Sequence, residues 1–112
     1  MDIETIAMKI IASAGDGKAM AFEALDEVKK GNFDKAKELL EQSEHVALEA
    51  HKAQTALIVD EANGNKAEVN VLLVHSQDHL MTGMLAQEMI REMIIMYEKM
   101  DEIKNLIEGV KQ

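Results

Sequence analysis

Apolar residues recur every three or four positions along nearly the whole chain, and this spacing predicts helices rather than strands. Three helices are expected, from Ile3 to Lys30, from Phe33 to Ala62, and from Lys66 to near Val110. The connections between them are short, so the helices should pack antiparallel to one another. The expected fold is all-α, an antiparallel three-helix bundle, in one domain over residues 1–112.

The first expected helix contains two glycines, Gly15 and Gly17. Each glycine costs roughly 1 kcal/mol of helix propensity relative to alanine, so the pair predicts a kink or a close approach of another backbone. A phosphate-binding glycine loop is disfavoured, because no strand precedes the pair and no Gly-Lys-Ser/Thr follows it. Lys30-Gly31 then marks the end of this helix, and Asn32 is the expected N-cap of the next.

The second connection is expected to be a tight turn. Asn63-Gly64 should end the second helix with a residue in the left-handed region. Asn65 and Glu68 have the spacing of a capping box, which predicts that the third helix begins at Lys66.

The third helix is apolar around most of its circumference. At about 100° per residue, one stripe contains Val71, Val74, Met81, Leu85, Met89, Met96, Met100, Ile103 and Ile107. Another side carries Leu73, Leu80, Met84, Ile95 and Leu106. A helix that is apolar on most sides must be buried on most sides. One side is therefore expected to face its own bundle and the other a second subunit, whereas the alternative is a monomer with an unusually apolar surface.

One charged residue, Asp78, lies in the middle of the apolar stripe. A carboxylate buried there alone would cost several kcal/mol, so it needs a cation, a partner or water. His75 and His79 lie one helical turn apart on the flank of the stripe, where a seam with a neighbouring helix would run. Such a pair can also be two partly exposed histidines without a role.

Composition narrows the possible functions. The chain has no cysteine, which excludes disulfides, thiolate metal sites and a cysteine nucleophile and suits a reducing cytoplasm. No apolar run is long enough for a membrane span, and the N-terminal residues lack the basic region of a signal peptide. The formal net charge of -9 argues against binding nucleic acid or an anionic membrane and favours a partner with a basic docking face.

The segment around the two histidines is the most specific part of the sequence. His75-Ser76-Gln77-Asp78-His79-Leu80-Met81-Thr82 resembles the phosphorylation-site segment of IIA components of sugar phosphotransferase systems, in the lactose/cellobiose (chitobiose) family. Three further blocks match the family in the same order. They are Ile10 to Gly15, Lys30 to Ala36, and Ala50 to Ile58, whose polar side chains are candidates for the surroundings of the site.

The resemblance implies a homotrimer in which the third helices form a parallel central coiled coil. It also implies that His75 is the phosphorylated histidine and that Asp78 and its two symmetry mates surround a divalent cation such as Mg²⁺. Gln77 and His79 match polar positions beside the phosphoryl group, and Thr82 is expected to belong to the same surroundings of His75. On a parallel trimer, Gln77 of a neighbouring chain is expected to reach His75.

The implied function is that of a cytoplasmic phosphocarrier. It accepts phosphate from HPr on His75 and passes it to a cysteine of the cognate IIB component, contacting the membrane component IIC only indirectly. Two alternatives are a helical protein that binds Zn²⁺ through His75, His79 and Asp78 of one chain, and an assembly bundle without site chemistry. The sequence leaves open the sugar (cellobiose, chitobiose or lactose), the metal species, the docking surfaces, and the roles of His45 and His51.

Overall fold

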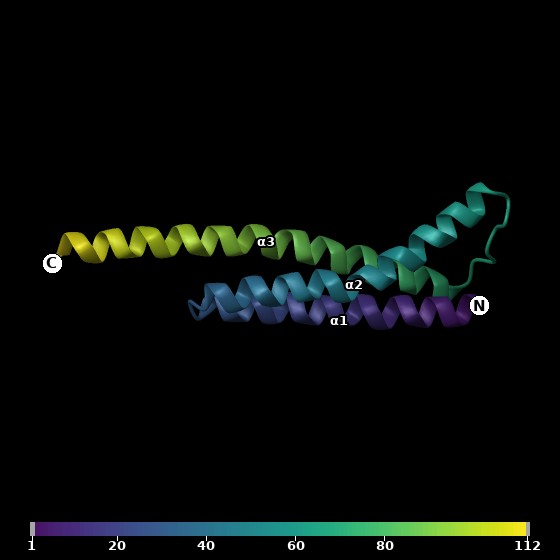
Figure 1. Ribbon diagram of the computed structural model, residues 1–112, viewed down its shortest axis with the longest axis horizontal. Helices are drawn as coiled ribbons and strands as arrows, with labels where there is room; N and C mark the ends of the chain where they lie inside the picture. Colours follow the sequence, from purple (N-terminus) through teal and green to yellow (C-terminus); the bar gives the residue numbers. More distant parts are fainter. Residues whose placement is uncertain (1, 112) are drawn as a thin grey trace.

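The computed structural model describes residues 2–111 and is a bundle of three long helices (Figure 1). Helix α1 spans Ile3–Lys29, α2 spans Phe33–Ala62 and α3 spans Val71–Lys111. Neighbours in the chain run in opposite directions, so α1 and α3 are parallel to each other and α2 is antiparallel to both (Figure 1). This confirms the predicted three-helix bundle.

Small residues allow the helices to pack closely. One core cluster contains Ala21, Ala24, Val28, Ala36, Leu40, Ile90 and Ile94, and a second contains Ile10, Ala14, Ala50 and Leu80. Alanines of α1 and α2 interlock in both clusters, and α3 contributes the larger aliphatic side chains that cover them. The second cluster lies directly beneath the His75 segment, because Leu80 belongs to the same two turns of α3.

Gly17 lies at a close approach of α1 and α2. A Cβ atom at this position would lie 2.9 Å from the Cβ of Ala47 and 2.9 Å from the carbonyl oxygen of Ser43. Helix α1 runs through Gly15 and Gly17 without interruption. A Cβ atom at Gly15 would meet nothing within 4 Å, so Gly17 alone marks the predicted close approach. The Ser43 hydroxyl donates to the Gly17 carbonyl, and the Gln87 amide donates to the Ser43 hydroxyl at 3.0 Å. These buried bonds join all three helices.

Both turns contain glycine in the left-handed region, Gly31 with φ 85° and Gly64 with φ 91°. Asn32 precedes α2 as predicted, but its side chain does not cap the helix and instead donates to Glu27 at 2.8 Å. The prediction that the third helix begins at Lys66 is wrong. Its first residue is Val71, because the Asn70 side chain accepts from the backbone N–H of Leu73 at 2.8 Å and caps the helix there.

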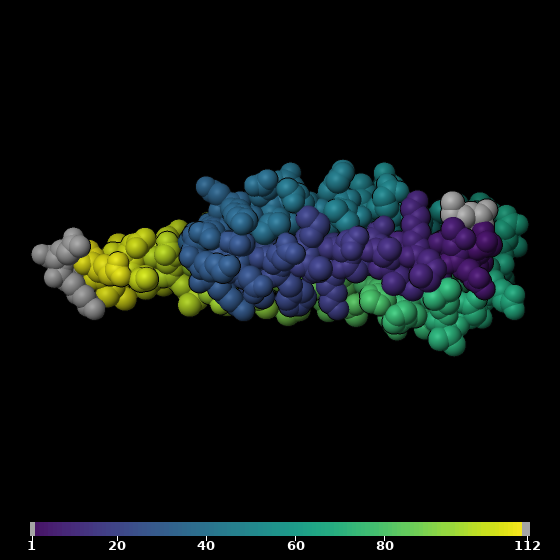
Figure 2. Space-filling view, turned by 90° about the horizontal axis from the view of Figure 1, so that it is seen from below, coloured from purple at the N-terminus to yellow at the C-terminus, as the bar shows by residue number. Residues whose placement is uncertain are grey.

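The later start of α3 lengthens the connection between α2 and α3, which was expected to be short. The C-terminal half of α2 diverges from α3 before the chain returns (Figure 1), and the two helices contact each other less than either contacts α1. At the opposite end, α3 extends past the turn between α1 and α2 and projects alone (Figures 1 and 2). Within residues 2–111, no helix is long and apolar enough to cross a membrane.

Most of the apolar stripe on α3 is exposed. We call this surface the open face of α3, and its residues are at least half exposed: Val71, Val74, Met81, Leu85, Met89, Met96, Met100, Ile103 and Ile107. The opposite side of α3 is buried, with Leu80 1% exposed and Ile90 2% exposed. The helix therefore buries only part of its apolar surface within one chain.

Candidate functional site

The predicted histidine pair is in direct contact. His75 and His79 lie one turn apart near the start of α3, and their Nε2 atoms are 3.1 Å from each other. The rings meet edge to face, with centroids 4.5 Å apart and an interplanar angle of 86°. Because a hydrogen bond needs one donor and one acceptor, one Nε2 carries the hydrogen and the other presents a lone pair. This contact between the rings is more specific than the i, i+4 spacing alone had indicated.

The two histidines lie at the border between the buried and open faces of α3. His75 is exposed and His79 is half-buried. The residues that follow them, Ser76 and Leu80, point to the other side of the helix and are buried in the core. The backbone beneath His75 is fixed by this packing. The His75 ring itself remains accessible, which is what a group that must meet other proteins requires.

Asp78 lies on the open face, as its position on the stripe predicted. It is exposed, and its carboxylate forms no hydrogen bond or ion pair with the described residues 2–111. Within the same part of the chain, no group of three or more His, Cys, Asp or Glu side chains is arranged to hold a metal ion. A Zn²⁺ site built by His75, His79 and Asp78 of one chain is therefore not formed.

The other two predicted site residues have different surroundings. Thr82 is exposed, and its hydroxyl donates to the carbonyl oxygen of Asp78 at 2.7 Å within the helix. Gln77 is half-buried on the flank away from His75, and its Oε1 accepts from the amide of Gln54 on α2. The sequence block containing Gln54 indicated polar surroundings for the site, but only the structure identifies which residue makes the contact.

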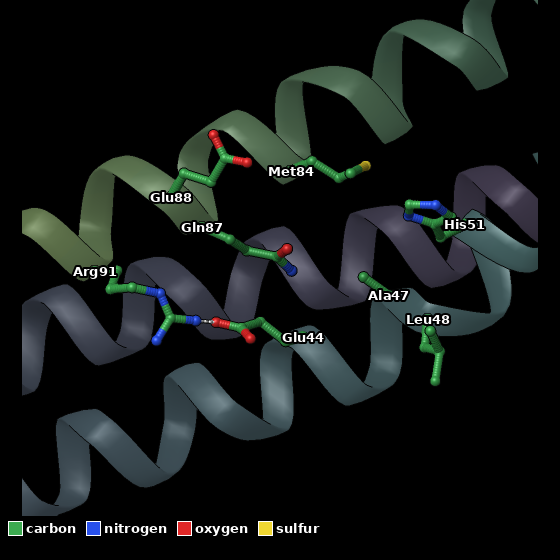
Figure 3. A pocket seen from close by; sticks show the side chains of 8 residues that line it. All are labelled: Glu44, Ala47, Leu48, His51, Met84, Gln87, Glu88 and Arg91. Carbon is green, nitrogen blue, oxygen red and sulfur yellow. Dashed lines mark ion pairs between the residues drawn. The ribbon is translucent and has the colours of Figure 1, made fainter.

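A groove between α2 and α3 lies beside the core that supports the site (Figure 3). It has a volume of about 310 Å³, and its lining includes Met84 and Glu88 from α3 and Ala47 and His51 from α2. Arg91 of α3 forms an ion pair with Glu44 of α2 at the end of the groove (Figure 3). This pair joins distant segments and was not predicted from the sequence.

The remaining histidines lie in different surface hollows. His51 lines the groove of Figure 3 together with Leu48 and Met84. His45 lines a separate hollow that contains Met20 of α1 and Val46 of α2. Neither histidine is hydrogen-bonded to His75, whose ring partner within the described chain is His79.

Comparison with known proteins gives a consistent result. The family model of the phosphotransferase system lactose/cellobiose-specific IIA subunit matches residues 5–98. The N,N'-diacetylchitobiose-specific EIIA component of Escherichia coli strain K12 is 42% identical over 99 residues, which are 88% of this chain and 85% of the relative.

Solved structures agree with the fold. The cellobiose-specific enzyme IIA from Bacillus anthracis superposes with a TM-score of 0.85 at 37% identity, covering 91% of this chain and 94% of the other. The IIA(chitobiose) chain in the solution structure of an Escherichia coli IIA–HPr complex gives a TM-score of 0.77 at 40% identity, covering 90% and 98%.

Proposed function

This chain belongs to the lactose/cellobiose-specific IIA family of sugar phosphotransferase systems, and we propose that it carries phosphate on His75. In this proposal it accepts the phosphoryl group from phospho-HPr and transfers it to a cysteine of its cognate IIB component. The observation that carries the proposal is the exposed His75 ring, paired with His79 at 3.1 Å on a rigid, core-anchored turn. The HPr complex of a relative with 40% identity supports HPr as the donor.

The chemistry at His75 needs a neutral imidazole, because only an unprotonated nitrogen can attack phosphorus. As the new N–P bond forms at Nε2, the N–P bond in phospho-HPr breaks and its histidine recovers the electron pair. The second transfer breaks the N–P bond at His75 and forms a P–S bond to the cysteine thiolate.

His79 is suited to assist these transfers. Its Nε2 faces the Nε2 of His75, so a phosphoryl group added there replaces the contact between the rings. A hydrogen on Nε2 of His79 then points toward a phosphoryl oxygen. Charge-stabilising donors of this kind are the main contribution a protein makes to phosphoryl transfer. In this proposal Thr82 has a smaller role, because its hydroxyl already donates within the helix.

The open face of α3 supports a homotrimer with the three α3 helices in a parallel coiled coil. Three copies of Asp78 would then meet at the axis and repel one another. A divalent cation such as Mg²⁺ prefers carboxylate and water oxygens and would neutralise this repulsion. The exposed, unpaired carboxylate of Asp78 fits such a ligand set. The same arrangement brings Gln77 of one chain toward His75 of its neighbour.

The transported sugar is a disaccharide in this proposal, and its identity stays open among cellobiose, chitobiose and lactose. The relatives carry different sugar names at comparable identity, 42% for a chitobiose component and 37% for a cellobiose enzyme. We place the transfer in the cytoplasm, with the membrane component IIC contacted only through IIB.

The direct test is phosphorylation in vitro with phosphoenolpyruvate, enzyme I and HPr. We expect one acid-labile, base-stable phosphate per chain, and no uptake when HPr is omitted. His75→Ala should abolish uptake while helix content and oligomer mass stay near wild type, because His75 lies outside the core. His45→Ala is the matched control and should retain uptake. A wild-type protein that takes no phosphate under these conditions would contradict the proposal and favour an assembly bundle without site chemistry.

A further inference from the structure

A hydrogen bond between two amides connects α2 to the site segment of α3. Nε2 of Gln54 donates to Oε1 of Gln77 over 2.5 Å, and both side chains are half-buried. Gln54 belongs to the C-terminal half of α2, the part of the helix that diverges from α3 (Figure 1). Contacts between the two helices are few, so this bond determines more of the local geometry than it would in a tightly packed core.

The direction of this hydrogen bond follows from the next residue. Ser76 is fully buried, and its hydroxyl donates to the carbonyl oxygen of Leu73 at 2.6 Å. A hydroxyl has one hydrogen, so Ser76 can only accept from Gln77, whose Nε2 lies 3.4 Å away. The nitrogen of the Gln77 amide therefore belongs on the Ser76 side and the oxygen on the Gln54 side. An amide rotated by 180° would bring two acceptors together at Ser76.

One N–H of the Gln77 side-chain amide is still available to donate a hydrogen bond. Oε1 of Gln77 is occupied by Gln54, and one of the two Nε2 hydrogens faces Ser76. A phosphoryl group carries only acceptor oxygens, so it is stabilised by an N–H and repelled by an amide oxygen. The rate of transfer should therefore depend on whether the Gln77 amide turns its NH₂ group or its oxygen toward the phosphoryl group.

We propose that Gln54 is a positioning residue for phosphoryl transfer. By donating to Oε1 of Gln77, it holds the Gln77 amide in the orientation that offers an N–H to the phosphoryl group on His75 of a neighbouring chain. The proposal rests on the phosphocarrier function proposed above. It adds a residue of α2 to a site whose other members all belong to α3.

The sharpest test replaces Gln54 with a residue of the same shape that can accept hydrogen bonds but cannot donate them. In Gln54→Glu the carboxylate forces the Gln77 amide to rotate, which places Oε1 against the Ser76 hydroxyl. We expect the rate of transfer from phospho-HPr to fall about tenfold or more. Gln42→Glu is the matched control, since it adds the same charge to the same helix at an exposed position whose amide contacts Glu38. Its rate should stay within about twofold of wild type.

A double variant separates positioning from stability. Gln54→Glu with Ser76→Ala removes the clash of acceptors while the Gln77 amide stays rotated. The double variant should therefore regain the thermal stability lost in Gln54→Glu, measured at matched protein concentration, but not the transfer rate. Recovery of both together would show that Gln54 only stabilises the bundle and would overturn the proposal.

Side-chain amide NMR gives a readout that does not depend on activity. The Gln77 NH₂ signals should shift in Gln54→Glu and remain unchanged in Gln42→Glu. If Gln54→Glu does not fold, Gln54→Met keeps the side-chain length without a donor. It should slow transfer by less than Gln54→Glu, because Ser76 still favours the original orientation of the Gln77 amide. Normal transfer in a folded Gln54 variant would overturn the proposal, whereas wild-type protein that takes no phosphate would instead contradict the proposed function.

Discussion

Two faces of α3 are both largely apolar but have opposite surroundings. Leu80, Ile90 and Ile94 are buried against α1 and α2, whereas Leu85, Met89 and Met96 are half exposed or more. Complete burial of such a side chain contributes about 1.5–3 kcal/mol. Covering the open face with another chain would therefore add a large stabilisation that the single chain lacks. A folded chain that leaves so much apolar surface in one stripe is built to associate.

The border between these faces holds the candidate chemistry. His75 and His79 lie where the buried core ends and the open face begins, and Asp78 lies on the open face itself. The buried face fixes the backbone of the site, and the open face is available for other chains. This difference predicts that substitutions on the buried face will lower the stability of the fold, whereas substitutions on the open face will weaken association between chains.

The largest effect is expected from truncating the buried face. Leu80→Ala should lower the free energy of unfolding by about 2–5 kcal/mol, because it opens a cavity between α1, α2 and α3. Leu85→Ala removes the same atoms from the open face and should mainly weaken association. Chemical denaturation at several protein concentrations distinguishes them. The Leu80→Ala loss should persist at every concentration, and equal behaviour of the two variants would contradict the division into faces.

Asp78 tests what the open face binds. Asp78→Leu should keep the trimer and make it insensitive to chelators, because replacing buried charges by apolar groups is often neutral or stabilising. Glu92→Leu is the matched control, since Glu92 lies about 40° from Asp78 around the helix and is also exposed. It should assemble and still weaken with chelator, as wild type does. Sedimentation with and without chelator measures both, and a monomeric wild type under both conditions would rule out the axial metal.

A substitution of His79 tests whether the residues at the border between the two faces carry out the transfer. His79→Ala removes the ring that contacts His75 but leaves the buried face intact, so transfer should slow on the order of a hundredfold while thermal stability changes little. Rapid-quench measurement of phosphate uptake gives the rate. His51→Ala, on the groove of α2, serves as the control and should retain wild-type kinetics. A wild-type rate in His79→Ala would show that His79 has no role in transfer.

The smallest effect concerns Glu27, far from the open face. The amide of Asn32 donates to Glu27 and, with Lys35 and Lys30 nearby, lowers the pKa of this carboxyl below its ordinary value. A lowered pKa means that the stabilisation is present above the unfolded pKa of about 4.3 and is lost as the pH falls through the folded pKa. Glu27→Gln should therefore be slightly less stable than wild type at pH 7 and equally stable in strong acid. Thermal unfolding across this pH range measures it, and a constant difference would contradict the ion-pair account.

Much of the fold could be predicted from the sequence, because helical periodicity is a local signal. The bounds of α2 agree with the pattern at both ends, and Gly31 and Gly64 adopt the expected turn geometry. The start of α3 was missed because Asn65 and Asn70 are both good N-caps. Choosing between them depends on how far α2 diverges before the chain returns, which is a tertiary property.

For the site, the sequence identified the residues but not their contacts. His75 and His79 could be paired from their spacing, whereas the side-chain partner of Gln77 on α2 is Gln54, which is 23 positions away. Contacts between helices depend on register and rotation, and small shifts in either change the partner. The assignment of Mg²⁺ to Asp78 remains a prediction, because it requires three chains.

The central claim is that His75 is the residue that carries phosphate. Mass spectrometry of the phosphorylated protein, under conditions that preserve phosphohistidine, tests it most directly. The account predicts that the label lies on His75 and that a Gln substitution there removes it. Phosphate on His79, His51 or His45 would contradict the account, because the exposed ring at the border of the two faces would then not be the acceptor.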